Sequence, residues 1–518
     1  MKKKLVVLLV CMFLASLLTA CIGGNETQGT TTDGNNGQES STEEKILTFG
    51  STESTTSLDP HMDWNGWYGV RYGITETLFK LNDSLVPEPW LAESYENIDG
   101  LTWKIILKDN VFFTNGEAVT AHKVVENMQR FGEVNYRAAV FATASYTVED
   151  DLTILIKTEA PYATLINDLS DPYASIIDLA TTEDRETHPI GTGPYISVEF
   201  LPDESVTLEK NQSYWDGTPK LDKVYVKKIS DMDTLAMALQ SGEIDVAHNI
   251  TSDTVELFKD TSKYTVSQVE TSRAYMLYYN LETLPDEAVR KAISMAIDKE
   301  SICTYLLNNS ATPAVGAFPD RMVYGGSNLK GVAYDSEGAK AILEQAGYRD
   351  LNGDGIREKD GEPLSINLVL YRRLSQEDIA TEMQSALKQI GIDVNVTVFD
   401  NTEYFKTGEF DIGMYCIVTS PTGDSDAFLN MTMRTGMDNN FGGYSHSKVD
   451  DLLEQLQQEY DPDKRAELTI EIQQLVLDDY AYDFIGFNNM TMIMKKNVTG
   501  FKAHPTDYYQ LNVNSDIQ

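Results

Sequence analysis

An acidic loop has the most chemically suggestive residue spacing in this sequence. Asp350, Asn352 and Asp354 occupy positions one, three and five of a twelve-residue calcium loop, where oxygen ligands are required. Gly361 stands at position twelve, where a bidentate glutamate belongs, and Glu362 comes one residue late. Two interpretations stay open: a weak calcium site with a structural role, or a plain acidic turn.

Patterns typical of catalysis or nucleotide binding are missing from the sequence. The six histidines include no His-Glu-x-x-His pair, no serine lies in a Gly-x-Ser-x-Gly turn, and no glycine-rich loop ends in Lys-Ser or Lys-Thr. Paired carboxylates are unavoidable among 80 acidic residues, so their presence discriminates nothing. We therefore expect no enzymatic activity and, the calcium loop aside, no cofactor.

Composition bounds the partners and the size of the core. The chain has 518 residues with 42% hydrophobic content, which is enough for a large core divided among several lobes. Its 80 acidic residues outnumber 41 basic ones, and the resulting negative field repels nucleic acid and anionic lipid headgroups. Nucleic acid is therefore excluded as a partner.

The first residues are typical of an export signal. Three lysines precede an apolar run from Leu5 to Leu18, which is shorter than the about 20 residues that a spanning helix needs. The following Leu18-Thr19-Ala20-Cys21 is similar to the bacterial lipobox, in which the cysteine receives a diacylglyceryl group. We expect a lipoprotein signal peptide over 1–20 and a lipid anchor at Cys21. The chain would then sit on the cell membrane and face the extracellular or periplasmic side.

Residues after the predicted anchor have the composition of a tether. Residues 23–44 contain no aliphatic or aromatic side chain, so they cannot bury enough surface to offset the entropy of ordering. We expect the lipidated cysteine and a flexible tether to occupy 21–45. Beyond them only Cys303 and Cys416 remain, too few for a disulfide framework. Buried free thiols are favoured, and pairing is left open.

Strands and helices alternate from residue 46 onward, which indicates α/β lobes. Alternating or continuous apolar runs predict strands near 45–49 and over 101–107, 153–157, 206–209, 224–229, 366–370 and 394–399. Amphipathic periodicity predicts helices beginning after Pro285 and at Ser336, and over 449–458 and 463–478. Gly347 is suited to the left-handed position after the second of these helices.

Short motifs in a fixed order connect the sequence to a known family. They are Leu85–Ser94, Asp99–Trp103, Phe112–Ala121, Gly191–Tyr195, Tyr214–Gly217, Ser241–Asp245 and Val289–Lys299. The series resembles solute-binding protein family 5, the peptide and nickel receptors of ABC importers, and the resemblance covers residues 46–518. Each motif alone is weak, and most are structural, with glycines and prolines that shape turns. Their common order carries the resemblance.

The resemblance implies an α/β, two-lobed, type II periplasmic-binding-protein-like fold with an extra subdomain in lobe I and the ligand in the interlobe cleft. We expect lobe I over 46–285, with the inserted subdomain at about 90–188, lobe II over 286–484, and a C-terminal return to lobe I over 485–518. Ligand contacts made by both lobes would stabilise the closed state, which a permease recognises.

Short peptides are the leading ligand that the resemblance implies, and a nickel chelate is the alternative. The chain would act as a monomer with ABC permease and ATPase subunits. A ligand sensor or a hydrolase on the same scaffold is a further alternative from another functional class.

The family's opening loop and its hinge strand suggest five ligand contacts. Leu58–His61 resembles the loop at the cleft, which implies contacts from His61, Trp64 and Tyr68. The competing interpretations are a hydrogen-bonded structural histidine and aromatic side chains that seal the lobe core. Arg273 and Tyr275 lie where the family's hinge strand passes the ligand, although Arg273 could instead pair with surface acids.

Two segments of the expected second lobe supply the remaining candidates. Val418 and Pro421 replace the tryptophan and aspartate that hold the peptide in the family's dipeptide branch, so Asp424 is the substitute carboxylate and Thr419 its neighbour. A solvated turn is the alternative for Asp424. The nickel branch's arginine is also missing, because residues 170–174 match its loop. Asn440 and Tyr444 belong to a segment similar to the one opposite the cleft, where Tyr444 faces either the ligand or the core.

Overall fold

The computed structural model describes residues 44–180, 184–250 and 252–518. The predicted signal peptide at 1–20, the lipid anchor at Cys21 and almost all of the tether predicted for 21–45 lie outside the described residues. These three assignments therefore stay predictions.

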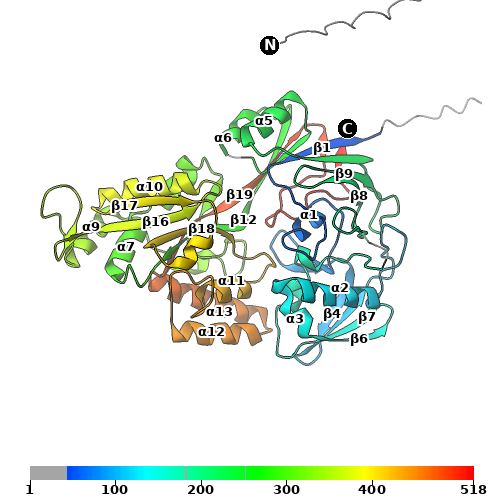
Figure 1. Ribbon diagram of the computed structural model, residues 1–518, viewed down its shortest axis with the longest axis horizontal. Helices are drawn as coiled ribbons and strands as arrows, with labels where there is room; N and C mark the ends of the chain where they lie inside the picture. The colour runs from blue at the N-terminus through cyan, green and yellow to red at the C-terminus, as the bar shows by residue number, and fades with distance from the viewer. Residues whose placement is uncertain (1–43, 181–183, 251) are drawn as a thin grey trace, which may run out of the picture. The chain divides into compact units, whose positions relative to one another are not determined.

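One mixed sheet runs through most of the structure (Figure 1). Its strand order is β17-β16-β18-β12-β19-β11-β1-β10-β9-β8, and β13 pairs with β19 beside this path. Their bounds are β1 Ile46–Ser51, β8 Tyr195–Leu201, β9 Ser205–Lys210, β10 Lys223–Lys228, β11 Val246–His248, β12 Tyr264–Tyr279, β13 Ala311–Pro313, β16 Ser365–Tyr371, β17 Asp393–Phe399, β18 Ile412–Val418 and β19 Tyr482–Lys495. The strands predicted from alternation in this sheet are all present.

The two longest strands join the halves of this sheet. β12 and β19 are antiparallel partners, and their register is irregular between Glu270 and Ala274. Beyond this irregularity β12 pairs with β18, whereas the opposite end of β19 pairs with β11. The strands β12 and β19 therefore belong to both halves of the sheet. Their irregular pairing lies where one half of the sheet passes into the other. A register shift of this kind bends a strand pair locally.

Separate hydrophobic cores lie on the two sides of this junction. The first lobe, named here for the half with β1, β8, β9, β10 and β11, has a core that includes Phe49 and Leu208. The second lobe, the half with β16, β17 and β18, has a core that includes Leu368 and Met414. The division is two-lobed and α/β. The residue boundaries proposed for the lobes stay a prediction.

A smaller sheet forms a third core beside the first lobe. Its order is β4-β5-β7-β6, with β4 Ala92–Asn97, β5 Thr102–Leu107, β6 Ser145–Asp150 and β7 Thr153–Lys157. Apolar residues of helix α2, among them Val124 and Met128, join Ile105 and Ile154 of the sheet in one cluster. Two-stranded pairs complete the strands: β2 Phe79–Leu81 with β3 Pro87–Pro89, β14 Glu358–Lys359 with β15 Glu362–Pro363, and β20 Val498–Thr499 with β21 Asp516–Ile517.

Capping residues mark one end of each of two predicted helices, α7 and α9. Asp286 accepts a hydrogen bond from the backbone N–H of Ala288 at the start of α7, and Gly347 adopts a φ of 93° just after α9. The α-helices are α1 Gly66–Arg71, α2 Ala121–Val134, α3 Ala139–Thr143, α4 Leu165–Asp168, α5 Met232–Ser241, α6 Ser252–Val255, α7 Glu287–Ala296, α8 Lys299–Ser301, α9 Ser336–Gln345, α10 Gln376–Gln389, α11 Asp426–Met433, α12 Ser447–Gln458 and α13 Pro462–Asp478. The four predicted helices correspond to α7, α9, α12 and α13.

Two properties bear on the cysteine and membrane predictions. Within the described ranges, no helix has both the length and the apolar character that crossing a membrane requires. Cys303 and Cys416 are both buried and both free thiols, so the interpretation favoured from the sequence is confirmed.

Candidate functional site

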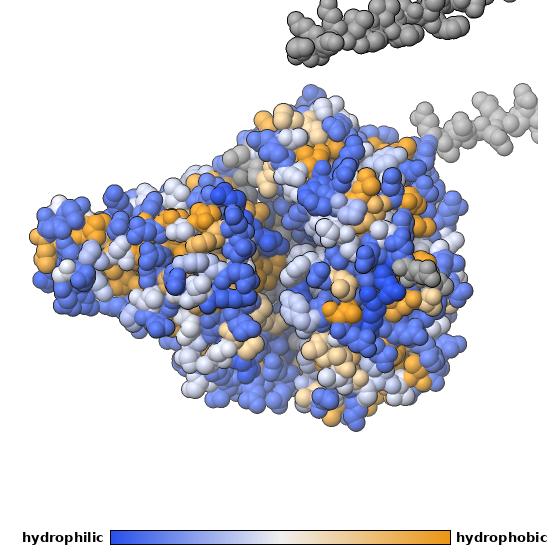
Figure 2. Space-filling model, in the orientation of Figure 1, coloured by the Kyte–Doolittle hydropathy of each residue, from blue (hydrophilic) through white to orange (hydrophobic). Residues whose placement is uncertain are grey.

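A cavity of about 500 Å³ lies where β12 and β19 cross between the lobes. Figure 2 shows the surface hollowed between the elements of the two lobes. The cavity is lined by Thr52, Glu53, Met232, Asn249, Thr271, Ser272, Arg273, Tyr371, Arg372, Arg373, Leu374, Asp400, Asn401, Thr402, Val418, Asn488, Met490, Pro505, Thr506 and Asp507. Many of these follow the carboxyl ends of β1, β16, β17 and β18, the position where open α/β sheets bind ligands.

An arginine anchors two carboxylates on the first-lobe side of the cavity. The Arg71 side chain is 0% exposed, and its guanidinium donates to Oε2 of Glu53 at 3.2 Å and to Oδ1 of Asp507 at 2.9 Å. Its Nε donates to the Asp507 carbonyl at 3.3 Å. Burial pushes the pKa of Glu53 upward, but the charges of Arg71, Arg273 and Arg373 outweigh burial and lower this pKa to about 2. Glu53 is therefore ionised at any physiological pH.

Two arginines on the other walls of the cavity have no such partner. Arg273 lies at the irregular pairing of β12, and Arg373 lies in the loop after β16. Among the described residues, no carboxylate lies within ion-pair distance of either guanidinium. Arg372, their neighbour, is bound to Glu377 at 2.5 Å. The cavity therefore has two half-buried positive charges that a ligand's anionic group can neutralise.

An aromatic cluster around Arg137 lies elsewhere on the first lobe. The Arg137 guanidinium is 4.6 Å from the Trp64 ring centroid and 5.0 Å from that of Tyr173, and Trp67 stacks on Tyr173. Within the described part of the chain, Nη1 of Arg137, Nε1 of Trp67 and the hydroxyl of Tyr173 are buried without a hydrogen-bond partner. Unsatisfied polar atoms at an arginine-aromatic cluster are costly and typical of functional surfaces. Of the predicted contacts, Trp64 belongs here, with 49% of its surface exposed.

His61 and Tyr68 are surrounded by protein. The ring of His61 is fully buried between the Ser175 carbonyl at 2.9 Å and the Arg130 guanidinium at 2.8 Å. Burial and the Arg130 charge lower the pKa of His61 to about 4, so its imidazole is neutral. Tyr68 is half-buried against Arg71. Neither side chain lines the cavity, and as ligand contacts both stay predictions.

Only one of the remaining contacts predicted from the sequence lines the cavity, namely Arg273. Tyr275, on the same strand, is buried and donates its hydroxyl to Asn488 at 3.3 Å. Thr419 is fully buried and donates its hydroxyl to the Ser272 carbonyl at 3.0 Å. Both side chains therefore support the wall of the cavity from behind, because each is bonded to a lining residue.

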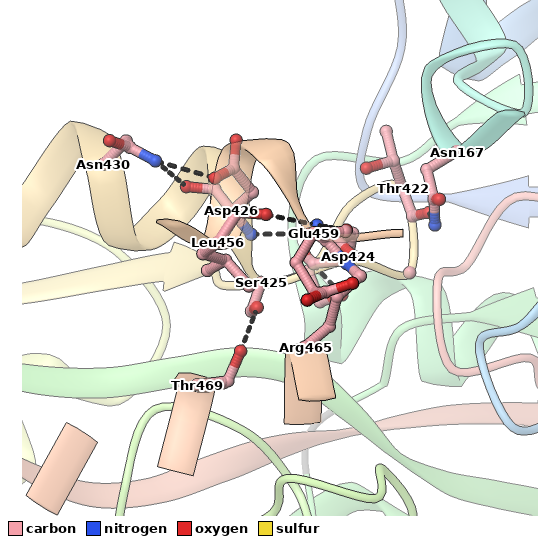
Figure 3. Close-up of polar contacts among 12 residues, drawn as sticks. Asn167, Thr422, Asp424, Ser425, Asp426, Asn430, Leu456, Glu459, Arg465 and Thr469 are labelled. Atoms are coloured by element: carbon pink, nitrogen blue, oxygen red, sulfur yellow. Dashed lines mark hydrogen bonds and ion pairs between the residues drawn. The ribbon is translucent and has the colours of Figure 1, made fainter. Parts of the chain in front are cut away.

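Asp424 is held by an arginine rather than by solvent (Figure 3). Arg465 donates to its Oδ1 at 2.6 Å and to its Oδ2 at 3.3 Å, and the Asp426 backbone N–H donates to Oδ1 at 2.7 Å. The free turn carboxylate considered as the alternative is therefore wrong, because this carboxylate has a bidentate partner. Nearby, Asn167 of the first lobe donates to the Thr422 carbonyl at 2.9 Å, which ties the two lobes together at this loop.

Asn440 and Tyr444 lie in the second-lobe structure away from the cavity. Asn440 donates its amide to the Tyr444 carbonyl at 2.7 Å and accepts from the Tyr444 backbone N–H at 2.9 Å. The Tyr444 ring is buried, and its hydroxyl donates to Asp479 at 2.8 Å. Of the two orientations open for Tyr444, the structure shows the one that faces the core.

The acidic loop brings three carboxylates together. Carboxylate oxygens of Asp350, Asp354 and Glu358 all lie within 4.8 Å of one another. The Asn352 amide is bonded to Asp354 through both of its polar atoms: its nitrogen donates to the Asp354 carboxylate at 3.0 Å, and its oxygen accepts from the Asp354 backbone N–H at 2.8 Å. Exposed carboxylates gather in this way with or without an ion, so calcium binding stays a prediction.

Sequence reasoning missed Glu53, Asp507 and Arg373. Two of them carried a readable signal, because Glu53 follows the first predicted strand and Arg373 follows the strand predicted over 366–370. Charged residues at the carboxyl ends of parallel strands meet at one edge of a sheet. Asp507 gave no such signal, since it reaches the site from a segment without regular structure.

Comparison with known proteins gives the same architecture. The model of the bacterial extracellular solute-binding proteins, family 5, matches residues 86–440. Nickel-binding protein NikA of Staphylococcus aureus is 29% identical over 457 residues, which cover 87% of this chain and 90% of NikA. Oligopeptide-binding protein AppA of Bacillus subtilis is 28% identical over 98% of each chain.

A solved structure agrees along its whole length. The crystal structure of a nickel ABC transporter protein from Bacillus halodurans superposes with a TM-score of 0.80 at 31% identity, and the match covers 92% of this chain and 100% of that one. The two-lobed α/β fold, the cavity at the junction of the lobes and the match over most of the sequence lead to one assignment. This chain belongs to the bacterial extracellular solute-binding proteins, family 5.

Proposed function

We propose that this chain is the substrate-binding lipoprotein of an ABC importer, which captures short peptides in the cavity between its lobes and delivers them to a permease. The observation that carries the proposal is the pair of unpaired arginines, Arg273 and Arg373, in the cavity. A peptide carboxylate would be an anionic partner for these two guanidinium groups. A cavity of about 500 Å³ is also the size of a small-ligand site.

A nickel chelate is the second candidate, and one specific observation favours it. The relatives named above include a nickel-binding protein, and a chelator with carboxylate groups fits the same arginines. The absence of a histidine or cysteine from the cavity lining argues that any metal would arrive already chelated.

Binding rather than catalysis is the proposed role. Among the residues that line the cavity, no serine, cysteine or lysine lies beside a histidine base. Lipid anchoring at Cys21, monomeric state and association with permease and ATPase subunits complete the proposal as expectations. A sensor that closes in the same way would differ only in its partner.

A thermal-shift experiment tests the ligand class. Ligand that binds only the folded state raises the melting temperature by linkage, so a short-peptide panel should raise it while nickel with L-histidine should not. The reverse pattern would establish the nickel chelate. If neither class changes the melting temperature at millimolar concentration, both ligand assignments are wrong.

A further inference from the structure

The two carboxylates held by Arg71 belong to residues that line the cavity, and each has one oxygen atom that Arg71 does not use. Glu53 uses only Oε2 on Arg71, and Asp507 uses only Oδ1. Among the described residues, no donor lies within hydrogen-bond distance of Oε1 of Glu53 or Oδ2 of Asp507. The side chains are 37% and 21% exposed, whereas Arg71 is 0% exposed. A ligand can therefore reach the carboxylates but not the arginine.

This side of the cavity has a net negative charge. Two carboxylates share the single charge of Arg71, and all three nitrogen groups of that guanidinium are already occupied. His248, which lies close by, adds no positive charge, because burial and Arg71 lower its pKa to about 4. One negative charge therefore remains without a local partner on the first-lobe side.

The opposite walls have the complementary charge. Arg273 and Arg373 are close enough to depress the pKa of Glu53, yet neither forms an ion pair with it. Asp400, in the loop after β17, also lines the second-lobe side, but Arg273 and Arg373 together outweigh its charge. The cavity thus has a negative first-lobe side and a net positive side formed by the strand junction and the second lobe. An opposed arrangement of this kind is complementary to a ligand with a positive and a negative end.

We propose that Glu53 and Asp507 form the receptor for a ligand ammonium group, so that the cavity selects zwitterions whose carboxylate lies on Arg273 and Arg373. This inference rests on the proposed function and adds the amine specificity of the site. Arg71 acts as a positioning residue, because it holds both carboxylates in place and touches no ligand.

The geometry explains why both carboxylates are required. Each carboxylate has one oxygen that Arg71 does not use. An ammonium group has three N–H donors, so one such oxygen accepts from only one of them and two oxygens accept from two. Asp507 has a φ of 62°, a left-handed conformation that aspartate and asparagine tolerate better than most residues. Replacement by asparagine therefore preserves the backbone and an acceptor for Arg71 while removing the charge.

The test compares ligands that differ only in the amine. Calorimetric titration of the full-length protein uses dialanine, N-acetyl-dialanine and, as a separate arm, nickel chloride alone. Acetylation of dialanine should weaken binding to the wild type by on the order of 10-fold to 100-fold, the range for a hydrogen-bonded charge. Glu53→Gln and Asp507→Asn should each remove most of this preference and leave the acetylated ligand bound as in the wild type.

The matched control is Asp245→Asn. Asp245 is also an ion-paired carboxylate of the first lobe, bound to Lys495 at 2.7 Å and to the Thr48 backbone N–H at 2.8 Å, but it does not line the cavity. This variant should keep the full preference for the free amine. Unchanged melting temperatures of the unliganded variants establish that folding is intact, and a variant that unfolds is replaced by Glu53→Asp, which should retain the preference.

Each failure has a distinct meaning. Equal affinity of the wild type for free and acetylated ligands overturns the inference and leaves the proposed function intact. Equal loss of both ligands in Glu53→Gln also overturns it, as does binding of nickel chloride alone that the two variants abolish. If the wild type binds none of these ligands, the proposed ligand class fails and the inference falls with it.

Discussion

At the scale of single residues, neighbouring arginines in the same loop have different roles. Both line the cavity, but Arg372 is exposed and paired with Glu377, whereas Arg373 is half-buried and has no ion pair among the described residues. Exposed ion pairs contribute little free energy, and a half-buried charge facing a ligand contributes more. The pair therefore provides a test with its own control.

Substitution of Arg373 by glutamine should weaken binding of a carboxylate ligand by on the order of 10-fold to 100-fold. The physical reason is loss of the charge that faces the ligand without a competing partner. Calorimetric titration with the ligand identified by thermal shift measures the effect. Arg372→Gln is the comparison variant and should weaken binding much less, because Glu377 already neutralises the charge of Arg372. Equal affinity of both variants would show that Arg373 contributes no more to binding than its paired neighbour.

A buried glutamate should make stability depend on pH. Glu76 is fully buried and accepts hydrogen bonds from Thr192 at 2.8 Å, Tyr214 at 2.6 Å and Trp215 at 2.8 Å. Burial raises its pKa to about 7 although these three donors lower it. Between pH 4.5 and 7 the folded state therefore keeps a proton that the unfolded state has lost, and stability falls as pH rises through that window.

Glu76→Gln should remove this dependence. Between pH 5 and pH 7 the wild type should lose about 2 kcal/mol of unfolding free energy relative to the variant, since one pKa unit corresponds to about 1.4 kcal/mol and the folded group is already half ionised at pH 7. Urea denaturation at both pH values measures the difference. The other carboxylates contribute equally to the pH dependence of both proteins, so their contributions cancel in the comparison. Parallel stability curves for the two proteins would show that Glu76 is ionised in the folded state.

At the scale of elements, the loop after β18 is where the lobes meet. Gly423 has a φ of 77°, and a Cβ there would lie 2.0 Å from the carbonyl oxygen of Leu85, in the loop between β2 and β3. The Tyr508 hydroxyl donates to the Pro421 carbonyl at 3.2 Å in the same loop. The glycine is therefore required both for its backbone conformation and for close approach of the two lobes.

Gly423→Ala should disfavour the arrangement in which the lobes touch. The clash involves backbone atoms, which cannot move aside as a side chain can, so the variant should bind ligand more weakly than the wild type. Gly436→Ala is the matched control, because Gly436 also has a positive φ, of 75°, with nothing within 4 Å of its Cβ position. Both variants are destabilised by about 1 kcal/mol, because alanine is strained in this left-handed conformation. Equal ligand affinity in the two variants would contradict the role of Gly423 in closure.

At the scale of the whole molecule, β12 and β19 are the strands that both lobes share. Arg273 lies at their irregular register, so a change in the bend at that point moves a cavity residue together with the lobes. Hinge motion typically uses a few residues at such junctions, and ligand contacts from both lobes shift the balance toward the closed form.

Saturating ligand should therefore make the protein more compact. Small-angle scattering of the wild type with and without ligand measures the radius of gyration, which should decrease on binding. The Arg373→Gln variant is the control and should show a smaller decrease at a ligand concentration about ten times the wild-type Kd, because its weaker affinity leaves it less occupied there. An unchanged radius in the saturated wild type would rule out closure as the mechanism.

Local pattern was sufficient for most elements and for the family, as particular segments show. The alternation over 366–370 predicted β16, and the periodicity after Pro285 predicted α7, whose N-cap in the structure is Asp286. The ligand contacts were less predictable, because Arg273 lines the cavity, whereas Thr419 is buried behind the cavity wall and Tyr444 is buried in the second-lobe core. The local sequence around a residue does not show which face of its strand will be covered by a segment that is distant in the chain.

The sequence by itself therefore determined the α/β class, the family and the expectation of a receptor, because periodicity and ordered motifs depend on neighbouring residues. Tertiary structure alone decided which charges face one another. Glu53 and Asp507 lie far apart in sequence, yet Arg71 holds them together, and the crossing of β12 and β19 places Arg273 nearby. The physical reason is that the charge balance of a cavity depends on which pairs are satisfied within the protein, and those pairs form only when the chain is folded.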